Sequence, residues 1–281
     1  MGCLCSSADR GLAARLEAAE AANVTAVARM AAGSIAVAIE EFAGGAAVFA
    51  GVASPMTHAL GIGMRGAVQA GEMERMERFF WDRGSACLMD LCPLADPSVI
   101  AFIESRPYRV VEFNNVLARR ILPDEGFGPA VGVQGVAEPD VGMWARVVSE
   151  GFAEYMPVTE EMVRMMTTAC QANQCWLAWD ESAGLGAAKS VQVERAPVAG
   201  AAMNVQNRVA LFSGDASLLS ARRKGWQAAL IRARLAAAQA QACEIAMATV
   251  LPGSASHRNY ERAGFELVYM RVNLMREKPE Q

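Results

Sequence analysis

The chain has 281 residues, of which 53% are hydrophobic and 20% charged, and its formal net charge is −4. The length allows one large domain or two smaller ones, and the composition is typical of a folded globular protein. We expect no nucleic-acid partner, because nucleic-acid binding normally requires a basic domain or stripe. No apolar run reaches the roughly 20 residues of a membrane-spanning helix, so we expect no membrane partner either.

The seven cysteines are scattered along the chain without a compact framework. An odd number in a long chain favours a reducing compartment, and we predict a cytoplasmic protein. The two histidines, His58 and His257, lie at no metal-ligand spacing from a pair of cysteines. We therefore predict no metal site.

The N-terminus begins with a short motif that matches an acylation signal. Gly2 is followed four residues later by Ser6, and Cys3 could take a second acyl chain. Because so short a pattern also arises by chance, we favour an unmodified terminus and keep acylation of Gly2 as the alternative.

The first half of the chain predicts a helix followed by strands and further helices. Apolar residues at helical spacing open it, and Gly44 and Gly45 indicate the turn of a hairpin. The predicted elements are, in chain order, a helix over residues 8–32, strands over 35–39 and 46–50, a helix over 72–83, a strand over 87–91, a helix over 97–104 and a strand over 108–113.

A glycine-rich run within this half, residues 61–66, fits the spacing of a dinucleotide-binding fingerprint. The fingerprint requires a strand directly before the glycines and a helix directly after them. No convincing parallel strand precedes the run, so we interpret it as a turn. A nucleotide site is the alternative.

A segment rich in proline, glycine and acidic residues, 122–129, is typical of a linker. We therefore predict two domains, residues 1–121 and 122–281. The second half again alternates strands and helices. Short similarities between the ends of the two halves suggest a duplicated unit, with a shared architecture alone as the alternative. Its predicted elements are, in chain order, a strand over residues 131–136, helices over 141–152 and 160–170, strands over 175–179, 198–205 and 209–212, a helix over 227–242, a strand over 245–251, a helix over 255–261 and a strand over 266–273.

The start of the long helix in the second half carries the strongest chemical signal. Arg222, Arg223 and Lys224 stand directly before Gly225. A helix start offers unpaired backbone N–H groups and the positive end of the helix dipole, and glycine lets the backbone approach a bulky anion. The pattern predicts a diphosphate site, with a solvated basic turn as the alternative.

This loop resembles the pyrophosphate loop of the GNAT superfamily of N-acetyltransferases, which reads Arg or Gln, two residues, Gly, one residue, then Gly or Ala. Arg222, Gly225 and Gln227 occupy those positions, although Gln227 and Trp226 are larger than usual. The resemblance implies an α/β GNAT fold with a mixed sheet, in two tandem domains of which the first is degenerate, and acetyl-CoA as co-substrate. The cofactor-binding residues that it implies are Ser217, Leu218, Leu219, Arg222, Arg223, Lys224, Gly225, Trp226 and Gln227.

A second motif strengthens the resemblance. Tyr260, followed four residues later by Gly264 and Phe265, is similar to the family's tyrosine and Gly-Phe pair. In the family this tyrosine lies near the thioester sulfur and can donate a proton to the departing thiolate. The resemblance therefore implies a catalytic role for Tyr260, and a packed tyrosine is the alternative.

The amine that attacks a thioester must also lose a proton, and Asp215 is the nearest carboxylate in the sequence that could accept it. A turn or cap role for Asp215, with water taking the proton, stays open. Ser213 and Gly214 are expected to form a strand bulge that exposes backbone amides to the cofactor.

Together these patterns predict an enzyme that transfers an acetyl group directly from acetyl-CoA to a primary amine of an unidentified small molecule or peptide, without a metal. The alternative is a non-catalytic acyl-CoA sensor or assembly module, because a fold can retain its ligand after losing its chemistry. Assembly as a homodimer stays open.

Overall fold

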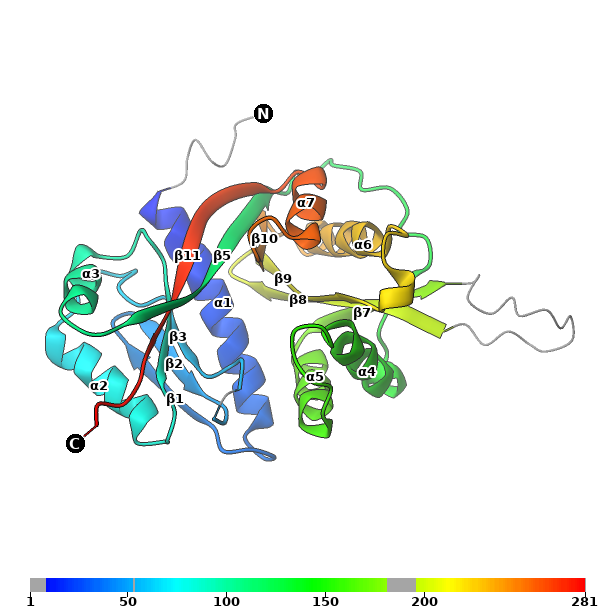
Figure 1. Ribbon diagram of the computed structural model, residues 1–281. Coiled ribbons are helices and arrows are strands. Elements are labelled where there is room, and N and C mark those ends of the chain that lie inside the picture. Colours follow the sequence, from blue (N-terminus) through cyan, green and yellow to red (C-terminus); the bar gives the residue numbers. More distant parts are fainter. Residues whose placement is uncertain (1–8, 53, 181–195, 281) are drawn as a thin grey trace, which may run out of the picture. The chain divides into compact units, whose positions relative to one another are not determined.

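The computed structural model describes residues 9–52, 54–180 and 196–280 (Figure 1). Strands and helices alternate along the chain and the sheets mix parallel and antiparallel pairs, so the predicted α/β class is confirmed. The motif at Gly2 that matches an acylation signal lies outside the described residues.

The chain divides into two compact units. Unit 1 comprises Met1–Arg119, Thr249–His257 and Glu266–Gln281, and unit 2 comprises Arg120–Ala248 and Arg258–Phe265. The end of the chain therefore returns to the unit formed by its beginning. The division into domains of residues 1–121 and 122–281 stays a prediction.

Unit 1 is built on a mixed sheet with the strand order β1-β2-β3-β4-β11-β5. Helix α1 packs on one face, and α2 and α3 pack on the other (Figure 1). The elements are α1 (Arg10–Ala31), β1 (Ala38–Phe42), β2 (Gly45–Phe49), β3 (His58–Leu60), α2 (Ala70–Trp81), β4 (Cys87–Leu91), α3 (Pro97–Glu104), β5 (Arg109–Arg120) and β11 (Glu266–Arg276).

Unit 2 is built on strands in the order β10-β9-β8-β7-β6. Helices α4 and α5 pack on one face, and α6 packs on the other (Figure 1). The elements are β6 (Val133–Gly135), the 3-10 turn η2 (Glu138–Asp140), α4 (Val141–Gly151), α5 (Glu160–Ala172), β7 (Gln174–Asp180), β8 (Ala196–Gln206), β9 (Val209–Ser217), the 3-10 turn η4 (Leu219–Ala221), α6 (Trp226–Ala240), β10 (Ile245–Val250) and α7 (Ala255–Arg262).

The alternation of side chains along β7 supplies apolar residues to both faces of this sheet. Cys175 and Leu177 belong to the buried cluster around α4 and α5, whereas Ala178 belongs to the cluster beneath α6. Successive side chains of a strand point to opposite faces, so a strand covered on both sides reads as a nearly continuous apolar run.

The hairpin predicted in the first half forms, but its turn lies one residue earlier than expected. Phe42 pairs with Gly45, which leaves Ala43 and Gly44 as the two turn residues, both with positive φ. Gly45 is needed for another reason, because a Cβ there would lie 2.1 Å from the carbonyl oxygen of Leu60 on β3. The neighbouring strand thus requires glycine at this position.

The same order of elements occurs in both units. In unit 1, β3 leads through α2 to the parallel strand β4, and in unit 2, β9 leads through α6 to the parallel strand β10. The expectation that no strand precedes the glycine-rich run 61–66 is wrong, because β3 ends directly before it. The run itself forms turns, as predicted, and α2 begins four residues after it.

Candidate active site

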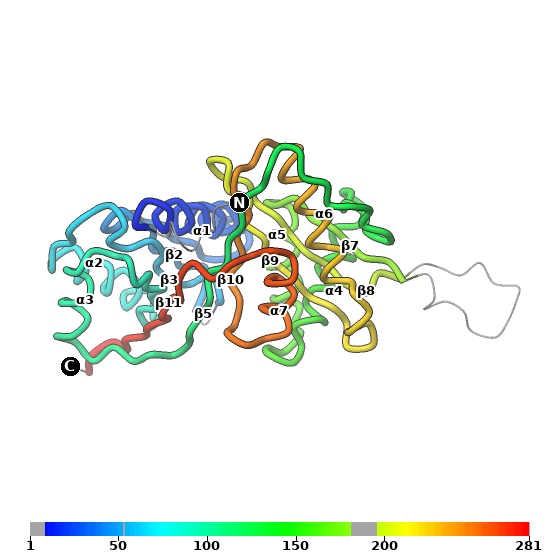
Figure 2. Tube along the Cα trace, turned by 90° about the horizontal axis from the view of Figure 1, so that it is seen from above, coloured from blue at the N-terminus to red at the C-terminus, as the bar shows by residue number. Residues whose placement is uncertain are grey.

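The predicted cofactor loop links β9 to α6 in unit 2, and Figure 2 shows it in yellow. Gly225 is the N-cap of α6 and has a left-handed backbone with φ of +83°, and Arg223 also has a positive φ of +64°. A Cβ on Gly225 would meet no atom within 4 Å. Gly225 is therefore required by the backbone turn, and the space beside the first N–H groups of the helix is open to a bulky anion.

Two cations of the loop contact carboxylates of other elements in unit 2. Arg222 forms an ion pair with Glu154, in the segment after α4, and donates to the carbonyl oxygen of Gly151 at 3.4 Å. Lys224 Nζ lies 3.1 Å from Oδ2 of Asp180, at the end of β7. Both cationic side chains are partly exposed, so both pairs lie within reach of a competing anion.

Trp226 and Gln227, the two large residues that depart from the family pattern, contact other elements of unit 2. The ring of Trp226 packs beside Gly132 and against the apolar cluster that contains Ala178 and Leu230. Gln227 Oε1 accepts a hydrogen bond from Asn259 Nδ2 at 2.7 Å, which ties α6 to α7. These contacts direct both large side chains to neighbouring elements.

The remaining residues of the predicted cofactor site lie at the end of β9 and at the start of the loop. Ser217 is the last residue of β9, and the backbone N–H of Leu218 donates to the carbonyl oxygen of Val198 at 2.9 Å. Leu219, in η4, is 64% exposed. The chain therefore leaves the sheet at Leu218 and presents an exposed turn before the basic residues.

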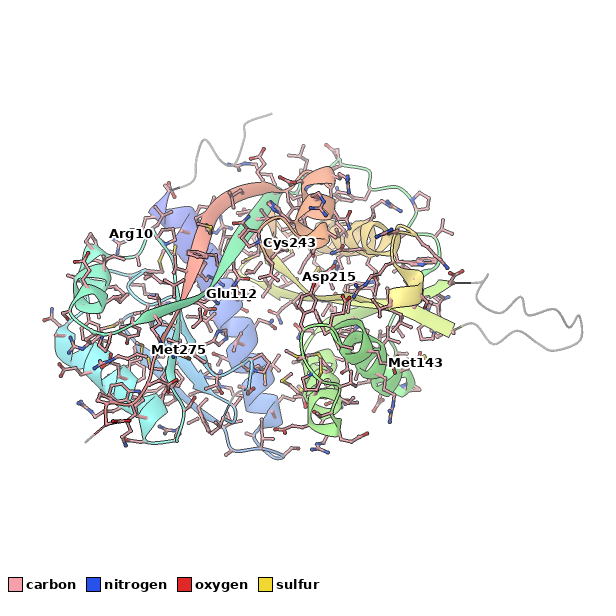
Figure 3. The ribbon with its side chains drawn as sticks, in the orientation of Figure 1. Arg10, Glu112, Met143, Asp215, Cys243 and Met275 are labelled. Atoms are coloured by element: carbon pink, nitrogen blue, oxygen red, sulfur yellow. The ribbon has the colours of Figure 1, made fainter. Side chains whose placement is uncertain are left out.

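Asp215 and Tyr260, the two predicted catalytic residues, are in direct contact in unit 2 (Asp215 is labelled in Figure 3). Tyr260 Oη on α7 donates to Asp215 Oδ2 on β9 at 2.7 Å. Arg234 on α6 donates from Nη1 to Oδ2 at 3.0 Å and from Nη2 to Oδ1 at 2.5 Å. Arg234 Nη2 also donates to Tyr260 Oη at 3.3 Å. The three side chains thus form one hydrogen-bonded cluster.

Burial and the charge of Asp215 together set the protonation states of Tyr260 and Arg234. Arg234 is fully buried and Tyr260 is 1% exposed. Burial raises the pKa of Tyr260 well above its ordinary value, against the opposing charge of Arg234. Burial alone would lower the pKa of Arg234, but the charge of Asp215 raises it instead. Tyr260 is therefore a neutral hydroxyl and Arg234 a cation at neutral pH.

Sequence reasoning missed Arg234, although its spacing contained a signal. It lies three residues after Ile231 and four before Ala238, and apolar residues at this spacing form a stripe along one face of a helix. An arginine on such a stripe is directed into the core, where it requires a full set of acceptors.

A bulge forms in β9 beside this cluster, but it lies one residue later than the bulge predicted at Ser213 and Gly214. Gly200 pairs with Ala216 and Ala202 pairs with Ser213, so Gly214 and Asp215 together oppose one residue, Ala201. The indole Nε1 of Trp144 on α4 donates to the carbonyl oxygen of Ala201 at 3.2 Å. One residue of a bulged strand is left outside the ladder, so its amide is available to another partner.

No family model matches the chain, and no curated protein sequence matches it. Solved structures do match. A GCN5-related N-acetyltransferase from Kribbella flavida superposes with a TM-score of 0.61 at 18% identity, over 95% of this chain and 96% of its own. Another, from Sphaerobacter thermophilus, has a TM-score of 0.52 at 16% identity, over 69% of this chain and 60% of its own. The chain has the GNAT fold. The fold predicted from the two motifs is thereby confirmed, and at these identities the likeness concerns the fold alone.

Two further observations concern only the described part of the chain. It contains no group of three or more His, Cys, Asp or Glu side chains that could hold a metal ion. Within the same residues, no helix combines the length and the apolar character needed to cross a bilayer.

Proposed function

We propose that this protein transfers an acetyl group directly from acetyl-CoA to a primary amine of a small molecule or peptide. The amine nitrogen attacks the thioester carbonyl carbon, the carbon–sulfur bond breaks, and CoA leaves as a thiolate that takes up a proton. Holding both reactants in one complex supplies much of the acceleration, so neither a metal nor a covalent enzyme intermediate is required.

The observation that carries the proposal is the start of α6 within a GNAT fold. Gly225 opens the helix in a left-handed conformation with free space beside it, and Arg222 and Lys224 flank it. In our proposal the diphosphate of acetyl-CoA binds the first N–H groups of α6, and the two cations exchange their present carboxylate partners for phosphate oxygens.

Tyr260 is the proposed proton donor to the departing thiolate. Burial keeps it protonated at neutral pH, as a donor must be, and its hydrogen bond to Asp215 fixes the direction of the hydroxyl. Asp215 is engaged by both Nη atoms of Arg234, so we propose that it orients Tyr260 and that water takes the proton of the amine. The same proposal includes a primary amine as the acceptor and a cytoplasmic location.

The competing function is acyl-CoA binding without transfer. It is favoured by one observation, namely that the Tyr260 hydroxyl already donates to Asp215 and would have to redirect its proton to reach a thiolate.

Release of free CoA separates the two functions. The full chain is incubated with acetyl-CoA and a panel of amino acids, polyamines, aminoglycosides and peptides, and thiol formation is followed with a chromogenic disulfide. An amine-dependent rate supports the transferase. Binding of acetyl-CoA by calorimetry with no amine-dependent thiol supports the sensor, and the absence of binding contradicts both.

A further inference from the structure

Arg234 stands out as a charged residue in an apolar layer. Its side chain is fully buried, and it lies among Leu230, Ile231 and Leu235, which are buried on the same helix. Removing a guanidinium from water is costly, and an apolar residue of similar size would often be at least as stable there. The position of Arg234 is therefore not explained by filling the core.

The acceptors of Arg234 lie on both sides of the β9 bulge. Nη1 donates to the carbonyl oxygen of Ala202 on β8 at 3.1 Å and to that of Ser213 on β9 at 3.5 Å. Ala202 and Ser213 form the pair at which the register of the two strands shifts. The same guanidinium holds Asp215, the second residue of the bulge.

The guanidinium is fixed in orientation as well as in place. Its Nε donates to the carbonyl oxygen of Leu230 at 3.2 Å, and its plane lies over the ring of Phe212, 4.5 Å from the centroid. A planar fork with five donors can join two strands, a carboxylate and a phenol at once, and the ammonium of lysine cannot reproduce this pattern.

These contacts join three parts of the proposed site. Arg234 lies eight residues after Trp226, roughly 12 Å along the helix that begins at the cofactor loop. From there it contacts the bulge of β9 and the hydroxyl of Tyr260. One side chain thus links the helix of the cofactor loop to both groups that the reaction would use at the thioester.

We propose that Arg234 is a positioning residue for acyl transfer. Through Asp215 and the carbonyl groups of Ala202 and Ser213 it holds the β9 bulge open toward the thioester, and through Tyr260 it holds the proposed proton donor. It touches neither the cofactor nor the acceptor. This inference rests on the proposed transferase function.

The test separates positioning from stability. Arg234→Lys keeps the charge and loses the fork, and Arg234→Met combined with Asp215→Asn removes the buried cation together with the charge of its carboxylate partner. Arg232→Met, on the same helix and half-buried, is the matched control. Each full-length variant is measured for melting temperature, for acetyl-CoA dissociation constant by calorimetry, and for the rate of CoA release at saturating acetyl-CoA.

We expect both Arg234 variants to bind acetyl-CoA within about threefold of the wild type and to release CoA at least about tenfold more slowly, since only transition-state contacts are disturbed. The control should retain both values. If the double variant fails to fold, Arg234→Lys alone decides.

Two outcomes overturn the inference, and they are distinguishable. Folded Arg234 variants that release CoA as fast as the wild type show that Arg234 is structural, and they leave the transferase proposal intact. If the wild type does not bind acetyl-CoA, or binds it but releases no CoA with any amine, the proposed reaction itself is wrong. The variants are then not compared.

Discussion

Tyr260 and Asp215 lie 45 residues apart in the chain and share a hydrogen bond of 2.7 Å. Their contact could not be predicted from spacing, because it depends on how α7 and β9 pack. It favours an orienting role for Asp215 over that of proton acceptor, since its oxygens already accept hydrogen bonds from the fork of Arg234 and from the hydroxyl of Tyr260.

Tyr260→Phe tests the proposed proton donor. The substitution removes one hydroxyl and keeps the ring, which packs edge-on against Phe265. We expect turnover to fall about tenfold or more with acetyl-CoA affinity little changed, because general acid assistance is lost. Unfolding should be easier by ~1 kcal/mol, the usual contribution of one hydrogen bond. Unchanged turnover would mean that Tyr260 is structural and that water protonates the thiolate.

Glu154→Gln tests whether the carboxylate of Glu154 competes with the diphosphate for Arg222. The pair is partly exposed, and such pairs contribute about 0.2–1 kcal/mol, so we expect acetyl-CoA to bind up to about fivefold more tightly in the variant. Glu150→Gln, on the neighbouring helix α4 and exposed, is the control. Weaker binding in Glu154→Gln, measured by calorimetry, would contradict a competing role for Glu154.

At the scale of elements, the left-handed N-cap of α6 allows a matched pair of substitutions. Asn and Asp both tolerate the φ of +83° at Gly225 and differ in charge. Gly225→Asn should keep most of the acetyl-CoA affinity. Gly225→Asp should lose roughly tenfold or more, because like charges a few ångströms apart repel by about 1–4 kcal/mol.

An acidic N-cap stabilises a helix, so Gly225→Asp should melt no lower than Gly225→Asn. Thermal melting with and without acetyl-CoA checks both statements. If acetyl-CoA raises the melting temperature of the two variants equally, the cofactor does not bind at this loop.

In unit 1, a buried ionic cluster ties β3, β4, β11 and α1 together. Arg271 on β11 donates to Glu17 at 2.8 Å and to Glu20 at 2.8 Å, and His58 Nδ1 lies 3.1 Å from Asp90 Oδ2. Burial alone would lower the pKa of His58, but the charge and the hydrogen bond of Asp90 raise it above its ordinary value.

The raised pKa of His58 predicts a pH-dependent stability. A group whose pKa is raised by folding stabilises the protein fully below its unfolded pKa, about 6.5, and this contribution is lost as pH rises through the folded pKa. The melting-temperature difference between wild type and His58→Gln should therefore be larger at about pH 5.5 than at about pH 9. His257→Gln is the control, and a difference that grows with pH would contradict the assignment.

At the scale of the whole molecule, two units with the same order of elements raise the question of two cofactor sites. In unit 1, the segment between β3 and α2 corresponds to the cofactor loop of unit 2. Other residues of unit 1 contact this segment at Gly63 and leave no room for an anion there. The carbonyl oxygen of Gly63 accepts from Arg10 at 2.9 Å, and a Cβ on Gly63 would lie 2.5 Å from Val99. Glu72, in the first turn of α2, accepts from the backbone N–H of Ala43 and would repel an anion.

We therefore expect one acetyl-CoA per chain. Calorimetric titration of the full chain should give a stoichiometry near one, and Gly225→Asp should weaken that single binding event. Two equivalent sites, or a site that is unaffected by Gly225→Asp, would place cofactor binding in unit 1.

The sequence alone determined most of the helices and strands, the α/β class and the two GNAT motifs, because these depend on local periodicity, turn residues and short spacings. The short strand β3 was missed. β4 and α3 form at their predicted bounds. Caps such as Asp96, which accepts from the N–H of Ser98 and precedes Pro97, are local signals that a sequence shows directly.

Only the tertiary structure decided which strand the end of the chain joins and which groups surround Asp215. β11 pairs with both β4 and β5, far from it in sequence, so no local pattern could reveal its partners. The spacing of Arg234 indicates only that it lies on an apolar face, whereas its acceptors come from β8, β9 and α7. Burial and hydrogen bonding fix the position of the Arg234 side chain. Burial depends on how several elements pack together, so no single segment of the sequence shows it.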